Sequence, residues 1–183
     1  MIDDYLFLNS IHSAKHNSST NNTTINQIEN IDLLLFVDVG IGDGFYGKLV
    51  KYLKPNVYMI GVEKEKSYIE KWNLKNIYNE IINDDIINVI QELKGDLIIF
   101  GDILEHLEKE NATKVISTSV NNFSYILINS PVGFQEQEHE IHSEIHRCGL
   151  SKEDFINYNI LNYEEFDDNR MFNCLIKGNK KKT

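Results

Sequence analysis

Three glycines within five positions make the strongest chemical signal in this chain of 183 residues. Gly40, Gly42 and Gly44 follow the apolar run 33–39 and precede a segment with helical spacing, 45–54. Glycine allows a tight turn and a close approach of a ligand to the main chain, and the first turn of the next helix adds free N–H donors. We therefore interpret the segment as a ligand-binding turn and not only as a strand-to-helix connection.

The spacing of these glycines distinguishes two kinds of nucleotide ligand. A dinucleotide-binding turn has the pattern G-x-G-x-x-G, in which the third glycine lies where pyrophosphate meets the helix. In this chain the third glycine comes one position early, at Gly44, and Phe45 stands where that pattern requires glycine. An NAD-dependent oxidoreductase is therefore the less favoured alternative.

Acidic residues follow the next two apolar runs. Glu63 comes directly after the run 57–62 and lies 23 residues after Gly40. A carboxylate there can accept hydrogen bonds from both hydroxyls of a ribose, which indicates a nucleoside without choosing between the two kinds of ligand. Asp84 and Asp85 end a third, weaker run, where an aspartate can also serve as the N-cap of the following helix.

Two later segments carry further reactive groups. The segment 101–107 reads Gly-Asp-Ile-Leu-Glu-His-Leu and places Asp102 at the carboxyl end of a strand, where doubly wound sheets bind their ligands. The loop 130–146 holds three of the six histidines of the chain, namely His139, His142 and His146. A histidine in this loop could act as a general base, and the alternative is a polar surface loop with solvated histidines.

The elements that must position these residues alternate along the chain from residue 32 onward. Apolar runs and helical spacings predict strands at 33–39, 57–62, 77–83, 96–100 and 125–129, and helices at 45–54, 67–71, 85–93 and 108–121. A short helix begins at Ser151, and two last strands at 159–166 and 170–177 form an antiparallel hairpin. The sequence therefore predicts an α/β fold with three layers: a Rossmann-like, doubly wound sheet of seven strands, mostly parallel, with one antiparallel strand from the C-terminal hairpin.

The N-terminal part differs in composition from this pattern. Residues 9–30 are rich in Asn, Ser and Thr and offer little apolar surface, which predicts a loop or mobile segment. Tyr5 to Leu8 could dock on the body as a short cap. We therefore divide the chain into a polar, partly mobile segment at 1–31 and a single domain at 32–183.

From residue 32 to 177 the chain resembles the class I S-adenosylmethionine-dependent methyltransferases. The turn 38–44 has their G-x-G-x-G form, and 101–107 is similar to the D-x-L-E-H-L segment of members that act on small molecules or glycans. The resemblance implies S-adenosylmethionine as the cofactor and methyl transfer as the activity. The glycine turn would then hold the methionine end of the cofactor, with Asp38 facing its amine directly or through a water.

The same resemblance implies roles for the acidic strand ends. Glu63 would bind the ribose, and Asp85, or alternatively Asp84, would accept a hydrogen bond from the adenine amino group, with Ile86 covering the ring. Gly101 and Asp102 would line the pocket near the sulfonium. These expectations can be tested residue by residue in the structure.

The acceptor has to be inferred from the histidine loop, which looks like a Pro-x-Gly-Phe…His loop of related glycan-modifying and viral enzymes. We expect O-methylation of a small molecule or a glycan hydroxyl, because an oxygen nucleophile needs a base to remove its proton. The expected catalytic residues are His146, His142 and Asp102. An amine acceptor would need less help, so N-methylation stays open, as does a non-catalytic subunit that binds the cofactor.

A metal ion is a further alternative at the same place. Glu105 and His106, with His139 or His142, could gather round a divalent ion that acidifies a hydroxyl, as the Glu-His pair does in some relatives. The main expectation is a site without metal.

Charge and composition limit the partners. The formal net charge is −10, which repels nucleic-acid phosphates. In the resembled family, enzymes that methylate amino groups of nucleic acids carry an N/D-P-P-Y/F turn after the fourth strand, and this sequence lacks that turn. No apolar run approaches the roughly 20 residues that span a bilayer, and the acidic N-terminus does not resemble a signal peptide. We expect a cytoplasmic monomer or homodimer, and a partner protein could complete the acceptor site.

Overall fold

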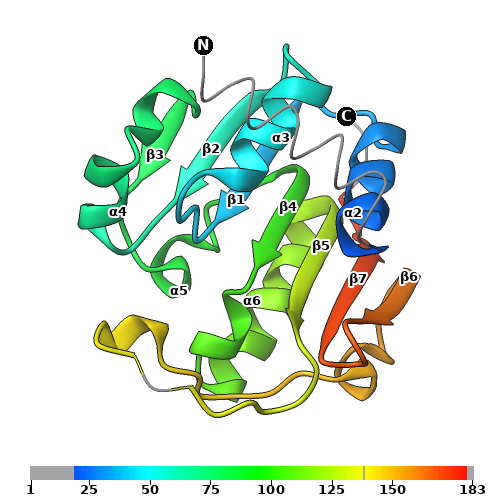
Figure 1. Cartoon of the computed structure of the whole chain (residues 1–183). Helices are drawn as coiled ribbons and strands as arrows, with labels where there is room; N and C mark the ends of the chain where they lie inside the picture. Colours follow the sequence, from blue (N-terminus) through cyan, green and yellow to red (C-terminus); the bar gives the residue numbers. More distant parts are fainter. Residues whose placement is uncertain (1–18, 138, 181–183) are drawn as a thin grey trace.

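The computed structural model describes residues 19–137 and 139–180, and the predicted cap at 5–8 lies outside these residues. A seven-stranded sheet in the order β3-β2-β1-β4-β5-β7-β6 forms its centre (Figure 1). The strands are β1 Leu35–Val39, β2 Tyr58–Val62, β3 Glu80–Ile82, β4 Gly95–Gly101, β5 Phe123–Pro131, β6 Asn159–Phe166 and β7 Met171–Lys177. β7 alone runs in the direction opposite to the other six strands of this sheet, which confirms the predicted topology.

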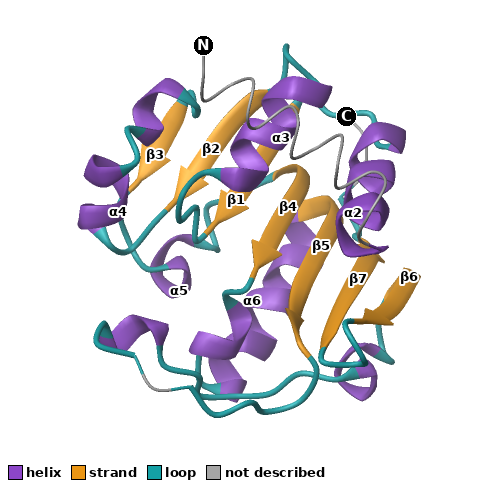
Figure 2. Cartoon of the chain, in the orientation of Figure 1, coloured by secondary structure: helices purple, strands orange, loops and turns teal. Residues whose placement is uncertain are grey.

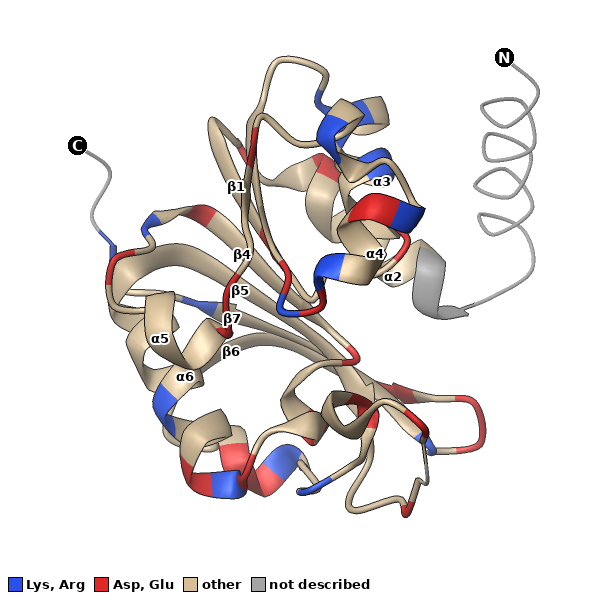
Figure 3. Ribbon diagram, turned by 90° about the vertical axis from the view of Figure 1, so that its left-hand side faces the viewer, with Lys and Arg blue, Asp and Glu red and all other residues tan. Residues whose placement is uncertain are grey.

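Helices cover both faces of the sheet (Figures 2 and 3). One face carries α2 Ser19–Asn30, α3 Phe45–Leu53 and α4 Lys66–Lys71, and the other carries α5 Ile86–Val89 and α6 Lys109–Asn122. Successive side chains of a strand point to opposite faces, so Phe36 packs into one apolar cluster and Val37 into the other. The predicted three layers are therefore confirmed, and no helix of the described residues could span a bilayer.

The helix α2 corrects the prediction for the segment before residue 32. Residues 9–30 were expected to be a loop or mobile, but 19–30 form a helix whose Ile25 and Ile28 are 2% and 0% exposed. Two isoleucines three residues apart lie on one helical face and dock against the sheet, although the rest of the segment is polar. The folded body therefore includes α2 as well as the residues from 32 onward.

Some elements are shorter than predicted. The third strand covers 80–82 instead of 77–83, because Tyr78 turns into the core and the Asn79 side chain accepts a hydrogen bond from the main chain of Met59. The helix predicted at 85–93 is a single α-helical turn, α5. The predicted cap at Ser151 is present as a capping box with Asp154, on the 3₁₀ turn Lys152–Phe155.

Candidate functional site

The order of the sheet places the glycine turn beside the other strand ends. The strand order reverses between β1 and β4, and ligands of such sheets bind outside the carboxyl ends at this point. Gly40, Gly42 and Gly44 have φ angles of +67°, +47° and +82°, a region that L side chains rarely adopt. A Cβ atom on Gly40 would lie 1.8 Å from Cδ1 of Ile103, so the turn also needs glycine for space.

Asp38 lies behind the turn and lines neither of the cavities described below. The side chain is 1% exposed, and its Oδ2 accepts a hydrogen bond of 2.5 Å from the hydroxyl of Tyr78. Burial raises the pKa of Asp38 to about 7, although this hydrogen bond acts in the opposite direction. Oδ1 of Asp38 has no hydrogen-bond partner among the described residues. The contact of Asp38 with a cofactor amine, directly or through a water, therefore stays a prediction, and Asp38 also holds the Tyr78 side chain in place.

A first cavity of about 460 Å³ lies on one side of Gly40. Glu63, Asp84, Asp85 and Ile86 all line it, as predicted from their positions after β2 and β3. The other lining residues are Val39, Gly40, Val62, Lys64, Glu65, Ile87, Ile103, His106, Leu107, Glu108, Asn111, His142, Ser143, Glu144 and Arg147. The strand ends therefore bring the predicted nucleoside-binding residues together at one cavity.

Glu63 connects this cavity to the glycine turn. Its carboxylate accepts hydrogen bonds from the main-chain N–H of Gly42 at 3.2 Å and of Glu65 at 2.8 Å. The side chain is 6% exposed, and this burial raises its pKa. Loss of Glu63 would therefore disturb both the cavity wall and the conformation of the turn.

The two aspartates after β3 make hydrogen bonds at the start of α5 while they line the first cavity. Asp85 is the N-cap of α5, where its carboxylate accepts from the N–H of Ile87 at 3.1 Å, and it pairs with Lys64 at 2.8 Å. The exposed carboxylate of Asp84 accepts from Asn88 at 2.8 Å, which lowers its pKa. The alternative prediction of Asp85 as an N-cap is thus confirmed, and this role does not exclude a hydrogen bond from a ligand in the first cavity.

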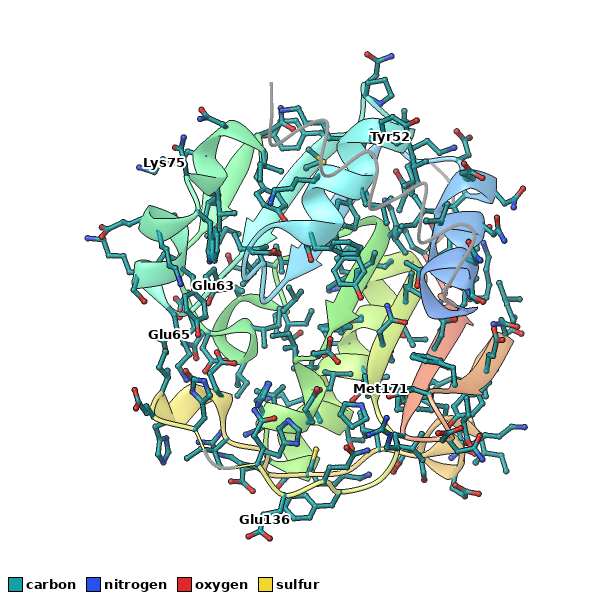
Figure 4. The ribbon with its side chains drawn as sticks, viewed as in Figure 1. Tyr52, Glu63, Glu65, Lys75, Glu136 and Met171 are labelled. Carbon is teal, nitrogen blue, oxygen red and sulfur yellow. The ribbon has the colours of Figure 1, made fainter. Side chains whose placement is uncertain are left out.

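A second cavity of about 450 Å³ lies on the other side of Gly40. Its lining comprises Gly40, Ile41, Gly42, Asp43, Phe45, Tyr46, Gly101, Asp102, Asn129, Phe166 and Met171. Figure 4 shows Glu63 and Met171 on opposite sides of the row of strand ends. Gly101 and Asp102 were predicted for the site, whereas Tyr46 and Asn129 were not.

Gly101 explains how Tyr46 reaches this cavity. A Cβ atom on Gly101 would lie 2.1 Å from Cε2 of Tyr46, so the glycine lets the ring lie over the end of β4. Asp102 follows with a φ angle of +53°, and its N–H donates to the carbonyl of Asn129 at 2.9 Å. The Asp102 side chain is exposed at the cavity, yet partial loss of hydration raises its pKa. The nearby His146 acts in the opposite direction and has the smaller effect.

Glu105, His106 and His146 form a cluster at the segment 101–107, which contributes lining residues to both cavities. One ligand atom of each lies within 4.8 Å of the others. Nδ1 of His146 lies 2.6 Å from the carbonyl of Gln135. A carbonyl only accepts, so Nδ1 carries a proton, and in the neutral form of the ring Nε2 is then the nitrogen with the lone pair.

The other two members of the cluster are poorly hydrated. Burial raises the pKa of Glu105 to about 8, which favours its neutral form at pH 7. Nδ1 of His106 is buried without a hydrogen-bond partner among the described residues, and burial lowers the pKa of this ring. The cluster can therefore offer neutral imidazole nitrogens either to a proton or to a metal ion.

The remaining histidines of the loop lie elsewhere. His139 is exposed, with Nδ1 accepting from the N–H of Ile141 at 3.1 Å, while His142 lies on the wall of the first cavity. The loop runs below the strand ends toward α4, where Ser143 donates to Glu65 at 2.6 Å (Figure 1). His146 thus joins Glu105 and His106 in place of the predicted His139 or His142, because the loop turns back at 142–144.

Solved structures with this fold are numerous, although no protein-family model and no curated protein sequence matches the chain. TehB from Haemophilus influenzae superposes with a TM-score of 0.68 at 16% identity, covering 91% of this chain and 65% of its own. An S-adenosylmethionine-dependent methyltransferase from Clostridium acetobutylicum gives 0.64 at 12% identity, covering 87% and 90%. The N-terminal domain of EvdMO1 with S-adenosylhomocysteine bound gives 0.62 at 9% identity, covering 92% and 84%.

These similarities show that the chain has the Rossmann-like fold of class I methyltransferases. The chain spans less than two thirds of the length of TehB. A shared fold hosts many reactions, so the activity has to be argued from the site.

Proposed function

We propose that this chain, which has the fold of S-adenosylmethionine-dependent methyltransferases, binds that cofactor across its glycine turn and transfers the methyl group. The observation that carries the proposal is the meeting of two cavities at Gly40, with Glu63 on one side and Asp102 on the other. A ligand with a nucleoside at one end and an amino acid at the other matches this arrangement.

Each end of the cofactor has partners of suitable chemistry. In the first cavity Glu63 can accept hydrogen bonds from the ribose hydroxyls, Asp85 from the adenine amino group, and Ile86 can cover the ring. In the second cavity Asp102 carries the charge that suits the cofactor amine. The positive φ angles of the turn leave main-chain groups open to the methionine end.

The reaction that the site supports best is O-methylation. An oxygen of the acceptor attacks the methyl carbon, the carbon–sulfur bond breaks, and S-adenosylhomocysteine leaves. Alignment of the reacting atoms can supply roughly 7–11 kcal/mol, so positioning is the main task of the protein. In its neutral form the His146 ring can take the proton of the acceptor hydroxyl at Nε2.

Calorimetric titration with S-adenosylmethionine, with NAD as a control ligand, tests the cofactor. We expect heat of binding with the first and none with the second. Glu63→Ala should weaken cofactor binding by roughly 10- to 100-fold, because it removes hydrogen bonds that involve a charged group. Glu80→Ala at the exposed start of β3 is the matched control. Absence of cofactor binding, or tighter binding of NAD, would contradict the proposal.

The same cluster supports a metal-assisted variant as a second candidate. Glu105, His106 and His146 have the ligand types that divalent ions accept, and the unpartnered Nδ1 of His106 is the observation that favours it. A bound ion would lower the pKa of an acceptor hydroxyl. Titration with Mg²⁺ and Mn²⁺ in the calorimeter should give heat that His146→Asn abolishes, and no heat from either ion would remove this variant.

Two further functional hypotheses, N-methylation and a non-catalytic subunit, predict different activities for the isolated chain. Turnover on amine acceptors but not on hydroxyl acceptors would indicate N-methylation. Cofactor binding without turnover on either class would indicate a non-catalytic subunit that works with a partner protein.

A further inference from the structure

A buried network of amide side chains lies behind the second cavity. Asn129 and Asn173 face each other across β5 and β7 and are 3% and 0% exposed. Nδ2 of Asn173 donates to Oδ1 of Asn129 at 2.9 Å, and Oδ1 of Asn173 accepts from Gln27 of α2 at 2.7 Å. Thr24, also buried, lies within 3.5 Å of the amide nitrogens of both asparagines. Buried polar groups are costly unless they are paired, and these pairs fix the direction of the Asn129 amide.

The direction of this amide decides what Tyr46 can do. Because Oδ1 of Asn129 is taken by Asn173, its Nδ2 donates to the hydroxyl oxygen of Tyr46 at 2.8 Å. The hydroxyl proton of Tyr46 then has no acceptor among the described residues. Burial, with the nearby charge of Asp102, raises the pKa of Tyr46 and keeps it protonated. Tyr46 therefore presents one neutral hydrogen-bond donor to the second cavity.

The other groups of the second cavity limit the charge of its ligand. Its charged lining residues are the carboxylates of Asp43 and Asp102, and no lysine or arginine of the described residues lines it. Phe166 and Met171, at the ends of β6 and β7, supply half-buried apolar surface at the rim. Such a wall disfavours an acceptor with a net negative charge, while it offers a donor, an acceptor and a flat apolar surface.

We propose that the second cavity binds the methyl acceptor, and that this acceptor is a neutral hydroxylated ring. One ring oxygen or hydroxyl accepts a hydrogen bond from Tyr46, a neighbouring hydroxyl donates to Asp102, and the ring face lies against Phe166 and Met171. The side chain of Tyr46 is positioned by Asn129, which is held in turn by Asn173 and helix α2. The inference rests on the proposed function, since the methionine end of the cofactor would fill the part of the cavity beside Gly40 and Gly42.

Binding of small probes to the protein saturated with S-adenosylhomocysteine tests this inference. Catechol and methyl galactoside represent a neutral phenol and a neutral sugar ring, and 3,4-dihydroxybenzoate differs from catechol only by a carboxylate. Affinities come from ligand-observed NMR titrations. We expect at least one neutral probe to bind, and 3,4-dihydroxybenzoate to bind at least 10-fold more weakly than catechol, on the order of the cost of one like-charge contact.

The variant Tyr46→Phe assigns the donor. It should weaken the neutral probe by roughly 3- to 10-fold, which corresponds to one hydrogen bond, and leave the affinity for S-adenosylhomocysteine unchanged. Tyr52→Phe, an exposed tyrosine on the same helix, is the matched control and should change neither affinity.

The outcomes separate this inference from the proposed function. If the wild-type protein does not bind S-adenosylhomocysteine, the proposed function fails first. If it binds the cofactor product but neither neutral probe, or if 3,4-dihydroxybenzoate binds as tightly as catechol, the acceptor class is wrong. If Tyr46→Phe binds the neutral probe as tightly as wild type, the role of Tyr46 is wrong.

Discussion

The first and the second cavity share Gly40, but their walls are built in different ways. The first is lined by residues that follow strands within three positions, such as Glu63 after β2 and Asp85 after β3. The second combines Tyr46 of α3 with Asn129 of β5, whose amide depends on Thr24, 105 residues away. Positions after strands can be read from local sequence, whereas long-range packing decides which side chains face the second cavity. A change behind the second cavity should therefore leave the first intact.

The largest expected effect concerns the cluster of Glu105, His106 and His146. His146→Asn keeps a donor for the carbonyl of Gln135 but lacks the nitrogen that would take the proton. Turnover should fall by about 10²–10⁴-fold, while affinity for S-adenosylmethionine changes less than 2-fold, as general bases contribute this much. Steady-state kinetics and calorimetry measure the two. Equal losses in turnover and affinity would mean that His146 belongs to the cofactor site instead.

Gly40→Ala should damage both cavities at once. The added Cβ atom meets Ile103, and φ is +67°, so we expect a loss of about 3 kcal/mol in the free energy of unfolding and weaker cofactor binding. Gly133→Ala is the control, because Gly133 has a φ angle of +68° with no atom within 4 Å of the added Cβ. It should lose only about 1 kcal/mol. Thermal unfolding compares them, and equal losses would show that the contact with Ile103 is unimportant.

Asn173→Ala should affect the second cavity alone. It leaves the buried Oδ1 of Asn129 without a donor, at a cost of about 1–3 kcal/mol in the free energy of unfolding. The affinity for adenosine, which occupies only the first cavity in our proposal, should stay unchanged. Asn162→Ala is the comparison, since the buried Nδ2 of Asn162 has no partner to lose. Urea unfolding should find that variant within about 0.5 kcal/mol of wild type. A drop in the affinity for adenosine with Asn173→Ala would contradict the independence of the two cavities.

The effect that is smallest per pH unit is the pH dependence that Glu105 gives to the free energy of unfolding. The carboxyl ionises near 4.5 in the unfolded chain and near 8 when buried. Between these values the folded protein keeps a proton that the unfolded chain has released, so the free energy of unfolding falls as pH rises. Glu105→Gln should remove this slope, which is roughly 1 kcal/mol per pH unit.

Urea unfolding at pH 5, 6, 7 and 8 measures that slope. Asp38 also has a raised pKa, but it contributes equally to both proteins and cancels in the difference. Glu153→Gln, at an exposed carboxylate, is the control. Parallel curves for wild type and Glu105→Gln would mean that Glu105 is ionised throughout this range.

The sequence predicted the sheet and the first cavity because both depend on local patterns. Apolar runs mark the strands, and the residue after each run lies at the ligand-binding edge, which holds for Gly40, Glu63 and Asp85. It missed α2, because the polar composition of this segment outweighed the spacing of Ile25 and Ile28.

The rest of the site depends on distant partners. Asp38 lies near the end of a strand, as Glu63 does, yet its buried carboxylate accepts a hydrogen bond from Tyr78, 40 residues away. Tyr46 reads as an ordinary helical aromatic until Gly101 and Asn129 are placed beside it. The irregular loop 132–150 has no periodicity that would show which histidine returns to Glu105, and only its folded path selects His146. A search for buried amides on facing strands would have suggested Asn129 and Asn173.

The contact between Gln27 and Asn173 joins residues 146 positions apart, which has a consequence for the order of folding. Closing so long a loop is costly in entropy before other contacts have formed, so α2 should dock after the sheet has assembled. The same helix should then be among the first elements to detach in local opening. The part of the molecule that we expect to select the acceptor is therefore completed late and lost early, while the glycine turn persists in partly folded forms.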